Sequence, residues 1–531
     1  MSHKILLADN VDPACEEVFA ERDIEAIRKT NLSRDELLAE IPSYQGIVVR
    51  SSTTVDAELI KAAGNLKVIG RAGVGVDNID IPAATSNGIL VMNTPDGNTV
   101  STAEHTCGMI LAMARNIPQS VARVKEGGWD RKKYMGSEVY GKRLGIIGLG
   151  KIGSEVAQRM QQFGMHIQAY DPFSSQEKAD RLDIELLELD ELLGNSDFIT
   201  VHTPLTDKTK GLISLKNADK LKKGVRLVNC ARGGIYKEED LLEMIEGGYV
   251  GGIALDVYSQ EPPAKDLQQM LKHPKIISTP HLGASTEEAQ EKVAEQIARQ
   301  MVDALEGKNF NGSLNGKSIA LTTNKEVKPF LTLAEKLGSF AMQLAPEHAS
   351  EFDFEYSGRC AKFADVLTDS ILKGMLAHHV SETVNLINAR VYAENLGLKI
   401  KETTAPARQT YGDLITIRLD GSAAFNKISG AAFGDDDFRI IEIDGFNIEL
   451  RLEGEILLYT NIDRPGMLAA VSGALSQQDI NIASLSLGRS HKGSNAVTAV
   501  AVDKHMSDDE LKPLLELDGV NALKYISLPE D

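Results

Sequence analysis

Residues 142–172 read KRLGIIGLGKIGSEVAQRMQQFGMHIQAYDP. An apolar run leads into G-x-G-x-x-G at Gly148, Gly150 and Gly153, and a segment with helical spacing is followed by an extended run that ends at Asp171. The first glycine permits a tight turn, the second lets a pyrophosphate approach the backbone, and the third lets the helix pack on the strand. The alternative is a Gly-rich turn of another α/β protein, but here the strand, the helix and the terminal acid are all present.

The same stretch also indicates which dinucleotide binds. The N-terminus of the helix would offer free N–H groups to the phosphates. A carboxylate at Asp171 would accept hydrogen bonds from a ribose 2′-hydroxyl and repel a 2′-phosphate. The sequence therefore predicts a site that prefers NAD to NADP.

Composition narrows the class of protein. A chain of 531 residues is long enough for three or four domains. Its net charge of −19 argues against partners such as nucleic acid or an anionic membrane. The start of the chain reads as a strand, without a signal peptide, and no apolar run is long enough to cross a bilayer. Four widely spaced cysteines predict neither a disulfide framework nor a metal site, and they fit a cytoplasmic location.

The alternation of apolar runs and helical segments predicts the fold class. Residues 1–98 alternate in the manner of a parallel sheet with crossover helices, and residues 99–285 do so again around the glycine motif. We expect two doubly wound parallel-sheet domains, one flavodoxin-like and one Rossmann-like, with a helix at 286–306 that returns the chain to the first of them. Residues 307–452 read as a separate α+β domain, and residues 453–531 follow the βαββαβ order of a ferredoxin-like domain.

Three details of this organisation are specific enough to compare with a structure. Residues 99–126 read as one long helical stretch, with Pro118 as almost its only interruption, buried between the two parallel-sheet domains. Within it, we expect His105 to be a packed or capping histidine. Residues 307–316 are rich in Gly and Asn and read as a linker. The first helix of the last domain is expected to present one apolar face made of Leu468, Val471 and Leu475.

Three polar residues follow predicted strands: Arg232, Glu261 and His281. Ligands of open α/β sheets bind outside the carboxyl ends of the strands. Hydride transfer from a hydroxy acid needs a base for the hydroxyl proton, a carboxylate that orients this base, and a cation for the substrate carboxylate. These three residues could supply those groups. From spacing alone, they could equally be solvated residues at loop edges.

Several stretches resemble the signature sequences of the D-2-hydroxyacid dehydrogenases, and together they span residues 1 to about 305. The stretches are NCARGG (229–234), DVYSQEPP (256–263), TPHLGAS (279–285), RAGVGVDNID (71–80), NTPDGNTVSTAEHTCGMIL (93–111) and GIIGLGKIG (145–153). The resemblance implies that Arg232 holds the substrate, that Glu261 supports the histidine and that His281 is the acid/base. It also implies an NAD site lined by Val74, Gly148, Gly150, Lys151, Ile152, Gly153, Asp171, Thr203, Cys230, Ala231, Arg232, Asp256, His281, Leu282, Gly283 and Ala284.

The order of the domains is similar to that of long-form members of this family, in which a regulatory intervening domain and an ACT domain follow the dehydrogenase. This resemblance implies NAD-dependent oxidation of D-3-phosphoglycerate to 3-phosphohydroxypyruvate, the first committed step of L-serine biosynthesis, with reduction of 2-oxoglutarate to 2-hydroxyglutarate as a side activity. It assigns the substrate to Arg50, Arg71, Asn98 and Lys132. Without the resemblance, the three cations would be read as ordinary surface residues.

The same resemblance implies regulation and assembly. NIDRPG (461–466) and DINIAS (479–484) match the motif that binds L-serine between subunits, which points to Asn461, Asp463 and Asn481 and to a homotetramer. Some members carry Asn at the position of Asp463 and His at that of Asn461. Two other functions are compatible with the motifs. One is another D-2-hydroxyacid dehydrogenase, such as a glyoxylate/hydroxypyruvate reductase, and the other is an NAD-sensing scaffold like the related transcriptional corepressors.

Overall fold

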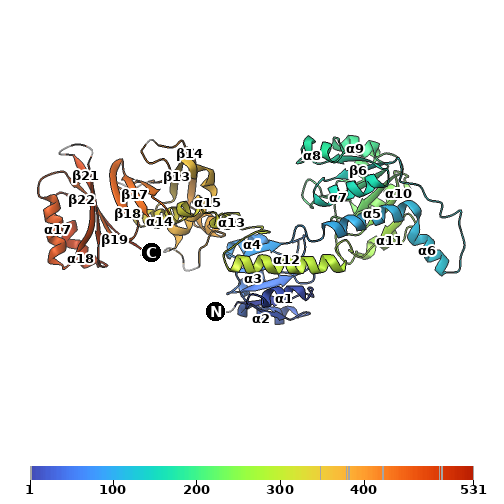
Figure 1. Ribbon diagram of the computed structural model, residues 1–531, viewed down its shortest axis with the longest axis horizontal. Helices are drawn as coiled ribbons and strands as arrows, with labels where there is room; N and C mark the ends of the chain where they lie inside the picture. The colour runs from blue at the N-terminus through green and yellow to red at the C-terminus, as the bar shows by residue number, and fades with distance from the viewer. Residues whose placement is uncertain are drawn as a thin grey trace.

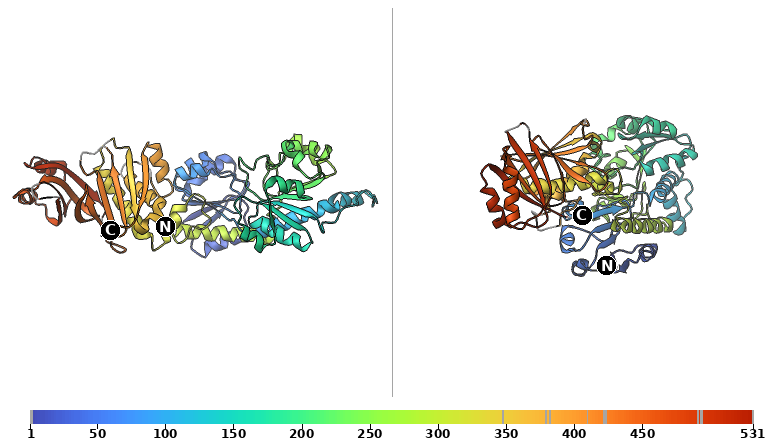
Figure 2. Two further views of the ribbon diagram at one scale, coloured as in Figure 1. Left: turned by 90° about the horizontal axis from the view of Figure 1, so that it is seen from above. Right: turned by 60° about the vertical axis from the view of Figure 1, so that its left-hand side comes forward.

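The computed structural model describes residues 3–346, 348–377, 380, 383–408, 410–420, 424–489, 491 and 494–529. The chain forms four sheets, and the molecule is elongated (Figures 1 and 2). Two parallel sheets lie toward one end and two sheets with antiparallel pairing lie toward the other. The helices of the described residues are all too short or too polar to cross a bilayer.

The first sheet has the strand order β2-β1-β3-β4-β5, and all its neighbours are parallel. This is the flavodoxin-like order that the sequence predicts. Its elements are β1 (Lys4–Leu7), α1 (Ala14–Ala20), β2 (Glu25–Arg28), α2 (Arg34–Glu40), β3 (Gly46–Val49), α3 (Ala57–Ala62), β4 (Val68–Arg71), α4 (Ile81–Ser86) and β5 (Leu90–Asn93). Further along the chain, α12 (Glu287–Leu305) returns to pack on this sheet, where its Met301 lies against Gly70 of β4.

The second sheet has the order β12-β11-β10-β9-β6-β7-β8, again with parallel neighbours. The chain reverses direction across the sheet between β6 and β9, as in a Rossmann fold, which confirms the predicted class. Its elements are β6 (Arg143–Ile147), α7 (Lys151–Gln162), β7 (His166–Tyr170), α8 (Gln176–Arg181), β8 (Glu185–Leu186), α9 (Leu189–Asn195), β9 (Phe198–Val201), β10 (Val225–Asn229), α10 (Glu238–Glu246), β11 (Val250–Leu255), α11 (Gln268–Leu271) and β12 (Ile276–Ser278).

The expectation of one helix over residues 99–126 is wrong. The stretch forms α5 (Thr99–Arg115) and α6 (Ile117–Lys125), separated by Asn116 with φ of 51°. The left-handed residue ends α5, and Pro118, which lacks an N–H group, is compatible only with the first turn of the next helix. The core of the Rossmann domain buries α5, whereas every residue of α6 is exposed or half-buried.

The predicted linker is ordered along the free edge of the first sheet. The Leu314 N–H donates to the carbonyl of Val91 at 2.8 Å, and the Val91 N–H donates to Asn315 Oδ1 at 2.9 Å. The Asn93 N–H donates to the carbonyl of Gly312 at 3.0 Å. Residues 312–315 of this segment are therefore hydrogen-bonded along β5, with one antiparallel bridge between Ser313 and Met92, which the Gly- and Asn-rich composition did not indicate.

The third sheet belongs to an α+β domain, as predicted, and has the order β14-β13-β15-β16-β17-β18. Its elements are α13 (Lys317–Ala320), α14 (Lys328–Leu344), β13 (Glu351–Ser357), α15 (Ala364–Leu376), α16 (Ala389–Asn395), β14 (Lys399–Ala405), β15 (Leu414–Leu419), β16 (Lys427–Ala432), β17 (Phe438–Ile443) and β18 (Phe446–Arg451). A side-chain hydrogen bond from Asn385 to the carbonyl of Gly88 joins this domain to the first one, at 2.9 Å.

The last sheet has the antiparallel order β20-β21-β19-β22, which is the predicted ferredoxin-like arrangement. Its elements are β19 (Gly454–Ile462), α17 (Met467–Gln477), β20 (Ile482–Arg489), β21 (Asn495–Val502), α18 (Asp508–Leu515) and β22 (Val520–Leu528). In α17, Val471 and Leu475 are buried as expected, but Leu468 is 43% exposed and Met467 takes its place in the core. The other face of this sheet packs into the core of the α+β domain through Ile456, Leu458 and Ile526.

Candidate active site

The G-x-G-x-x-G turn has the geometry that a pyrophosphate site needs. Gly148 has φ of 97°, and a Cβ atom there would lie 2.6 Å from the carbonyl oxygen of His202. A Cβ atom on Gly153 would lie 2.1 Å from the carbonyl oxygen of Gly148, so only glycine fits either position. Asp171 accepts a hydrogen bond from the Leu149 N–H at 2.8 Å, which places its carboxylate beside the turn. These residues fit NAD.

His281 and Glu261 are paired. The distance between His281 Nδ1 and Glu261 Oε2 is 2.7 Å, and the Tyr258 N–H donates to the second carboxylate oxygen at 3.2 Å. His281 itself has φ of 55°, a left-handed conformation that is costly for a residue with a side chain and is found most often at functional sites. The carboxylate orients the ring through Nδ1, and Nε2 is then the nitrogen that can exchange a proton with a substrate.

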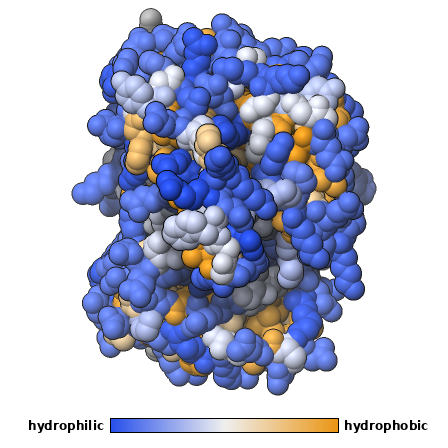
Figure 3. All heavy atoms as spheres, turned by 90° about the vertical axis from the view of Figure 1, so that its right-hand side faces the viewer, coloured by the Kyte–Doolittle hydropathy of each residue, from blue (hydrophilic) through white to orange (hydrophobic). Residues whose placement is uncertain are grey.

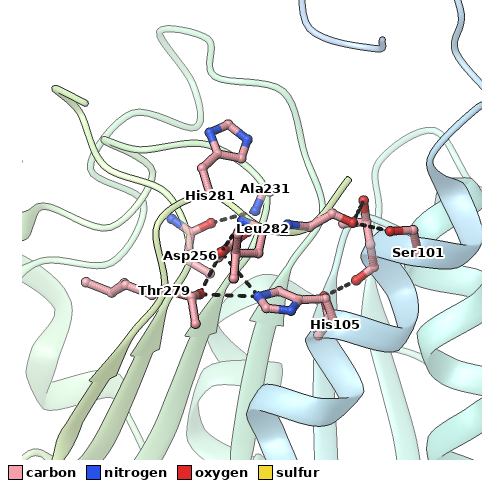
Figure 4. Close-up of polar contacts among 12 residues, drawn as sticks. Ser101, His105, Ala231, Asp256, Thr279, His281 and Leu282 are labelled. Carbon is pink, nitrogen blue, oxygen red and sulfur yellow. Dashed lines mark hydrogen bonds and ion pairs between the residues drawn. The ribbon is translucent and has the colours of Figure 1, made fainter. Parts of the chain in front are cut away.

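The turn after His281 rests on Asp256 (Figure 4). This side chain is fully buried, and it accepts hydrogen bonds from the N–H groups of Leu282 at 2.7 Å and Gly283 at 2.9 Å. It also accepts one from the Thr279 hydroxyl at 2.6 Å, and His105 Nε2 lies 3.2 Å away. Burial raises the pKa of Asp256, but the hydrogen bonds outweigh it and hold this pKa below its usual range.

Two sequence predictions concern residues of this network, His105 and Asp256. His105 is a packed histidine, as expected, and it reaches from α5 to Asp256 and to the Thr279 hydroxyl. The carboxylate of Asp256 lies beneath the turn with no exposed surface, so its observed contacts are with the protein. Its predicted contact with NAD stays a prediction.

Three arginines, Arg50, Arg71 and Arg232, lie near one another at the carboxyl ends of the two parallel sheets, and the region between these ends is called the cleft below. Burial, and then the charges of Arg50 and Arg232, lower the pKa of Arg71 to about 10, while Asp9 and Asp77 act in the opposite direction. The Arg71 side chain donates to the carbonyl of its neighbour Ala72, and its buried Nε has no hydrogen-bond partner among the described residues. A half-buried guanidinium near two like charges is destabilised, and an anion bound there would relieve this destabilisation. The cluster is therefore suited to a multiply charged anion.

Asp77 forms an ion pair with one of these arginines, Arg232. Its Oδ2 lies 3.4 Å from Arg232 Nε, and its side chain is 78% exposed. Arg50 is placed by its neighbours as well, because its N–H donates to the buried Asp9 at 2.5 Å and its guanidinium donates to the carbonyl of Asn10 at 3.0 Å. Neither aspartate was predicted from the sequence as a site residue. Asp9 follows β1 at the carboxyl end of the first sheet, and this position could have indicated its role.

The other predicted residues occupy several environments. Asn93, which was also missed, donates to the carbonyl of Val74 at 2.7 Å. Lys151 pairs with Asp96. Ile152 packs against the Rossmann core, Thr203 lies beside Gly148, the Ala231 N–H donates to Asn229 Oδ1, and the Ala284 carbonyl accepts from Gln290. Burial raises the pKa of the Cys230 thiol to about 12. The buried Asn98 Oδ1 has no hydrogen-bond partner in the described part of the chain.

Comparisons with known proteins agree with this geometry. The family model of the D-isomer specific 2-hydroxyacid dehydrogenase NAD binding domain matches residues 107–283. The D-3-phosphoglycerate dehydrogenase intervening domain matches residues 326–444, and the ACT domain matches residues 456–517. The chain is 41% identical to the D-3-phosphoglycerate dehydrogenase of Archaeoglobus fulgidus over 528 residues, which cover 99% of this chain and 100% of the relative. It is 39% identical to that of Bacillus subtilis over 98% of both chains, and 40% identical to that of Homo sapiens over 91% of both.

The chain belongs to the D-3-phosphoglycerate dehydrogenase family. Solved structures of other dehydrogenases are similar to part of the chain. A glyoxylate reductase from Paecilomyes thermophila has a TM-score of 0.54 and 28% identity, covering 59% of this chain and 98% of that one. A D-lactate dehydrogenase from Aquifex aeolicus, solved with NAD and lactic acid, has a TM-score of 0.52 and 27% identity, covering 57% and 96%. NAD is therefore the cofactor of the dehydrogenase domain.

Within a single chain, the residues predicted to bind the substrate do not all lie together. Lys132 is exposed, and it lies in the segment between α6 and β6, which projects beyond the second sheet (Figures 1 and 2). Arg50 follows β3 and Arg71 is the last residue of β4, both in the first sheet. Lys132 is thus separate from the arginine cluster of its own chain.

The residues predicted to bind L-serine are also far from one another within one chain. Asp463 follows β19 and pairs with Arg489 at 3.2 Å, whereas Asn481 precedes β20 and donates to Asp503 at 2.5 Å. The register puts these two positions at opposite ends of β21, and seven residues of antiparallel strand span about 24 Å. Asn461 is 3% exposed.

We expect the arginine cluster to bind inorganic phosphate. At a phosphate concentration a few times its dissociation constant, about 1 kcal/mol of stabilisation would raise the melting temperature by about 2–4 °C. Replacing Arg71 by methionine should remove this rise, measured by thermal denaturation at constant ionic strength. Arg123→Met, which removes a half-buried arginine of α6 that is paired with Asp130, should leave it intact. An equal phosphate effect in both variants would contradict an anion site at Arg71.

Proposed function

We propose that the protein oxidises D-3-phosphoglycerate to 3-phosphohydroxypyruvate with NAD, the first committed step of L-serine biosynthesis. The observation that carries the proposal is the 2.7 Å pair of His281 and Glu261 in the cleft that also holds three arginines. The name that its relatives carry over nearly their full length supports the same reaction. The four free, buried cysteines support a cytoplasmic location.

In the proposed reaction, Arg232 turns from Asp77 to bind the substrate carboxylate through two parallel hydrogen bonds. His281 takes the proton of the 2-hydroxyl group at Nε2, and Glu261 stabilises the imidazolium that results. Bound NAD supplies the acceptor for the hydride that leaves the same carbon. In the reverse direction, His281 returns this proton to the carbonyl oxygen as it is reduced.

The phosphate of the substrate distinguishes this reaction from its alternatives. We assign it to Arg50 and Arg71, with Asn98 nearby at the start of α5 and Lys132 supplied as described below. Residues 1–98 and 286–306 thus form the substrate-binding domain, and residues 99–285 form the NAD-binding domain. A glyoxylate/hydroxypyruvate reductase would have no phosphate to place against the two half-buried arginines, so this second function is less well supported.

Substrate kinetics test the proposal. His281→Asn should lower kcat by about 10²–10⁴-fold, because the general base is lost. Arg71→Met should raise KM for D-3-phosphoglycerate by at least about tenfold, since a charge-assisted contact contributes about 1.5–3 kcal/mol, yet leave KM for glyoxylate nearly unchanged. His166→Asn, at an exposed position of β7, is the matched control. Turnover of glyoxylate but not of the phosphorylated acid would refute the substrate, and NADH oxidation with 2-oxoglutarate would reveal the side activity.

A homodimer through α6 would complete the cleft. The segment after this helix exposes Trp129 (78%), Met135 (78%) and Tyr140 (77%), and α6 itself exposes Val121 and Val124. Figure 3 views this end of the molecule and shows apolar patches on a hydrophilic surface. Between α5, α6 and β12 lies a cavity of about 760 Å³, and its apolar lining includes Met109, Ala112 and Ile277. A second copy that inserts its own segment here would bury both surfaces and could carry Lys132 toward the neighbouring cleft.

A charge at Trp129 should therefore separate the subunits. We expect Trp129→Glu to halve the mass of the particle in light scattering at micromolar concentration, because it places a charge in a desolvated interface. Lys132→Met should leave the assembly intact and raise KM for the phosphorylated substrate. Leu396→Glu changes an equally apolar residue that is 53% exposed in the intervening domain, and it should change neither quantity. A monomeric wild-type protein with full activity would rule out the shared cleft.

We assign feedback regulation by L-serine to the ACT domain. Asp463 would bind the ammonium group, and Asn481, with Asn461 as a third residue, would bind the carboxylate or hydroxyl. Because Asp463 and Asn481 lie at opposite ends of the sheet, one serine can meet both only between two ACT domains, which fits a tetramer built from dimers.

Serine should accordingly inhibit the wild-type enzyme, and Asp463→Ala or Asn481→Ala should raise the inhibitory concentration by at least about tenfold, since each removes a charged or paired contact. Asp509→Ala, on the exposed first turn of α18, is the control. The measurement is the initial rate of NAD reduction against serine concentration. A wild-type rate that serine does not change would remove the effector and leave the dehydrogenase assignment in place.

A further inference from the structure

Glu238 is a buried carboxylate that the proposed chemistry leaves unused. It is the first residue of α10 and is 3% exposed. A buried carboxylate is retained in a fold only when donors compensate its charge. Its position at the N-terminus of a helix supplies part of this compensation, and the hydrogen bonds described next supply the rest.

The donors come from two different loops. Glu238 Oε1 accepts from the Gly234 N–H at 3.1 Å and from the Ser259 N–H at 2.7 Å. Its Oε2 accepts from the Ser259 hydroxyl at 2.7 Å. Gly234 follows β10 in the loop that carries Arg232, and Ser259 follows β11 in the loop that carries Glu261. One side chain therefore ties both loops together.

The two loops also touch directly. A Cβ atom on Gly233 would lie 1.8 Å from the carbonyl carbon of Tyr258 and 2.2 Å from the Ser259 nitrogen, so the backbones meet without room for a side chain. On one side of this contact, Asn229 Nδ2 donates to the Arg232 carbonyl at 2.8 Å. On the other, the Tyr258 N–H donates to Glu261, whose second oxygen meets His281.

We propose that Glu238 is a positioning residue, which sets the distance between Arg232, where the substrate carboxylate binds, and the Glu261–His281 pair, which exchanges the proton. The inference rests on the proposed function. Glu238 itself is buried and does not touch the cleft. Its effect is to hold the substrate carboxylate and the base in the one relative placement that aligns the 2-hydroxyl group with His281, and displacements of about 1 Å in such a placement can cost about a hundredfold in rate.

The reach of the side chain, rather than its charge, is the testable property. Aspartate keeps the charge but is one methylene shorter, so it cannot meet both loops. Glutamine keeps the reach: its carbonyl oxygen can accept from both N–H groups and its amide can donate to the Ser259 hydroxyl. Glu239 is the matched control, because it is the next residue of the same helical turn, carries the same charge and is exposed.

The experiment compares Glu238→Asp, Glu238→Gln, Glu238→Ala and Glu239→Ala in the full-length enzyme. We expect kcat to fall by at least about tenfold in the aspartate and alanine variants. The dissociation constant of NADH should change by a smaller factor, because the glycine turn lies outside both loops. Glu238→Gln should recover kcat to within about threefold of the wild type. If the alanine variant does not fold, the aspartate variant decides.

Amide exchange gives a readout that does not depend on the substrate. Residues 232–236 and 257–262 should exchange faster in Glu238→Asp than in Glu239→Ala. Wild-type kcat and exchange in Glu238→Asp would overturn the proposal, as would a Glu238→Gln variant as slow as Glu238→Ala, or a parallel loss of NADH binding. A wild-type enzyme active only on another 2-hydroxy acid would refute the proposed substrate, and the same comparison with that acid would still test Glu238.

Discussion

The hydrogen bonds around Asp256 are the interaction on which the active site depends. Its carboxylate has no exposed surface, and its donors come from Thr279 directly after β12, from the turn after His281 and, through His105, from α5. A charge without solvent is tolerated only because these donors replace water. The same bonds therefore fix three elements relative to one another, and the left-handed conformation of His281 follows from the turn that they hold.

The parts of the fold that depend on local pattern could be predicted from the sequence. The glycine turn, the alternating strands and helices and the βαββαβ order each follow from residues close together in the chain, and both parallel sheets have the expected order. The failures have local causes too. The residue type of Asn116 does not exclude a helix, and only its left-handed backbone conformation shows that the helix ends there. Leu468 and Met467 are neighbours of similar apolarity, so periodicity alone could not decide which of them is buried.

The site was predictable to the extent that it lies at strand ends. Glu261 and His281 were expected together because they follow two strands near each other in the sheet, and their 2.7 Å contact agrees with this. The arginine cluster depended on the family resemblance. The positions of Lys132, Asp463 and Asn481 depend on the path of a projecting segment and on strand register, and neither follows from residue type. Asp9 was missed although its position after β1 could have indicated its role, whereas nothing in the sequence distinguishes the buried carboxylate of Glu238 from exposed ones.

The strand-like course of residues 312–315 along β5 has a consequence for solubility. β5 is the edge strand of the first sheet, and a bare edge presents N–H and C=O groups that can pair with a strand of another molecule. Leu314 and Asn315 occupy two of these positions, and Gly312 occupies a third. The segment that connects the two halves of the chain thus also covers the edge of β5. A dehydrogenase half that ended after α12 would keep its cleft residues but would carry an open template for aggregation.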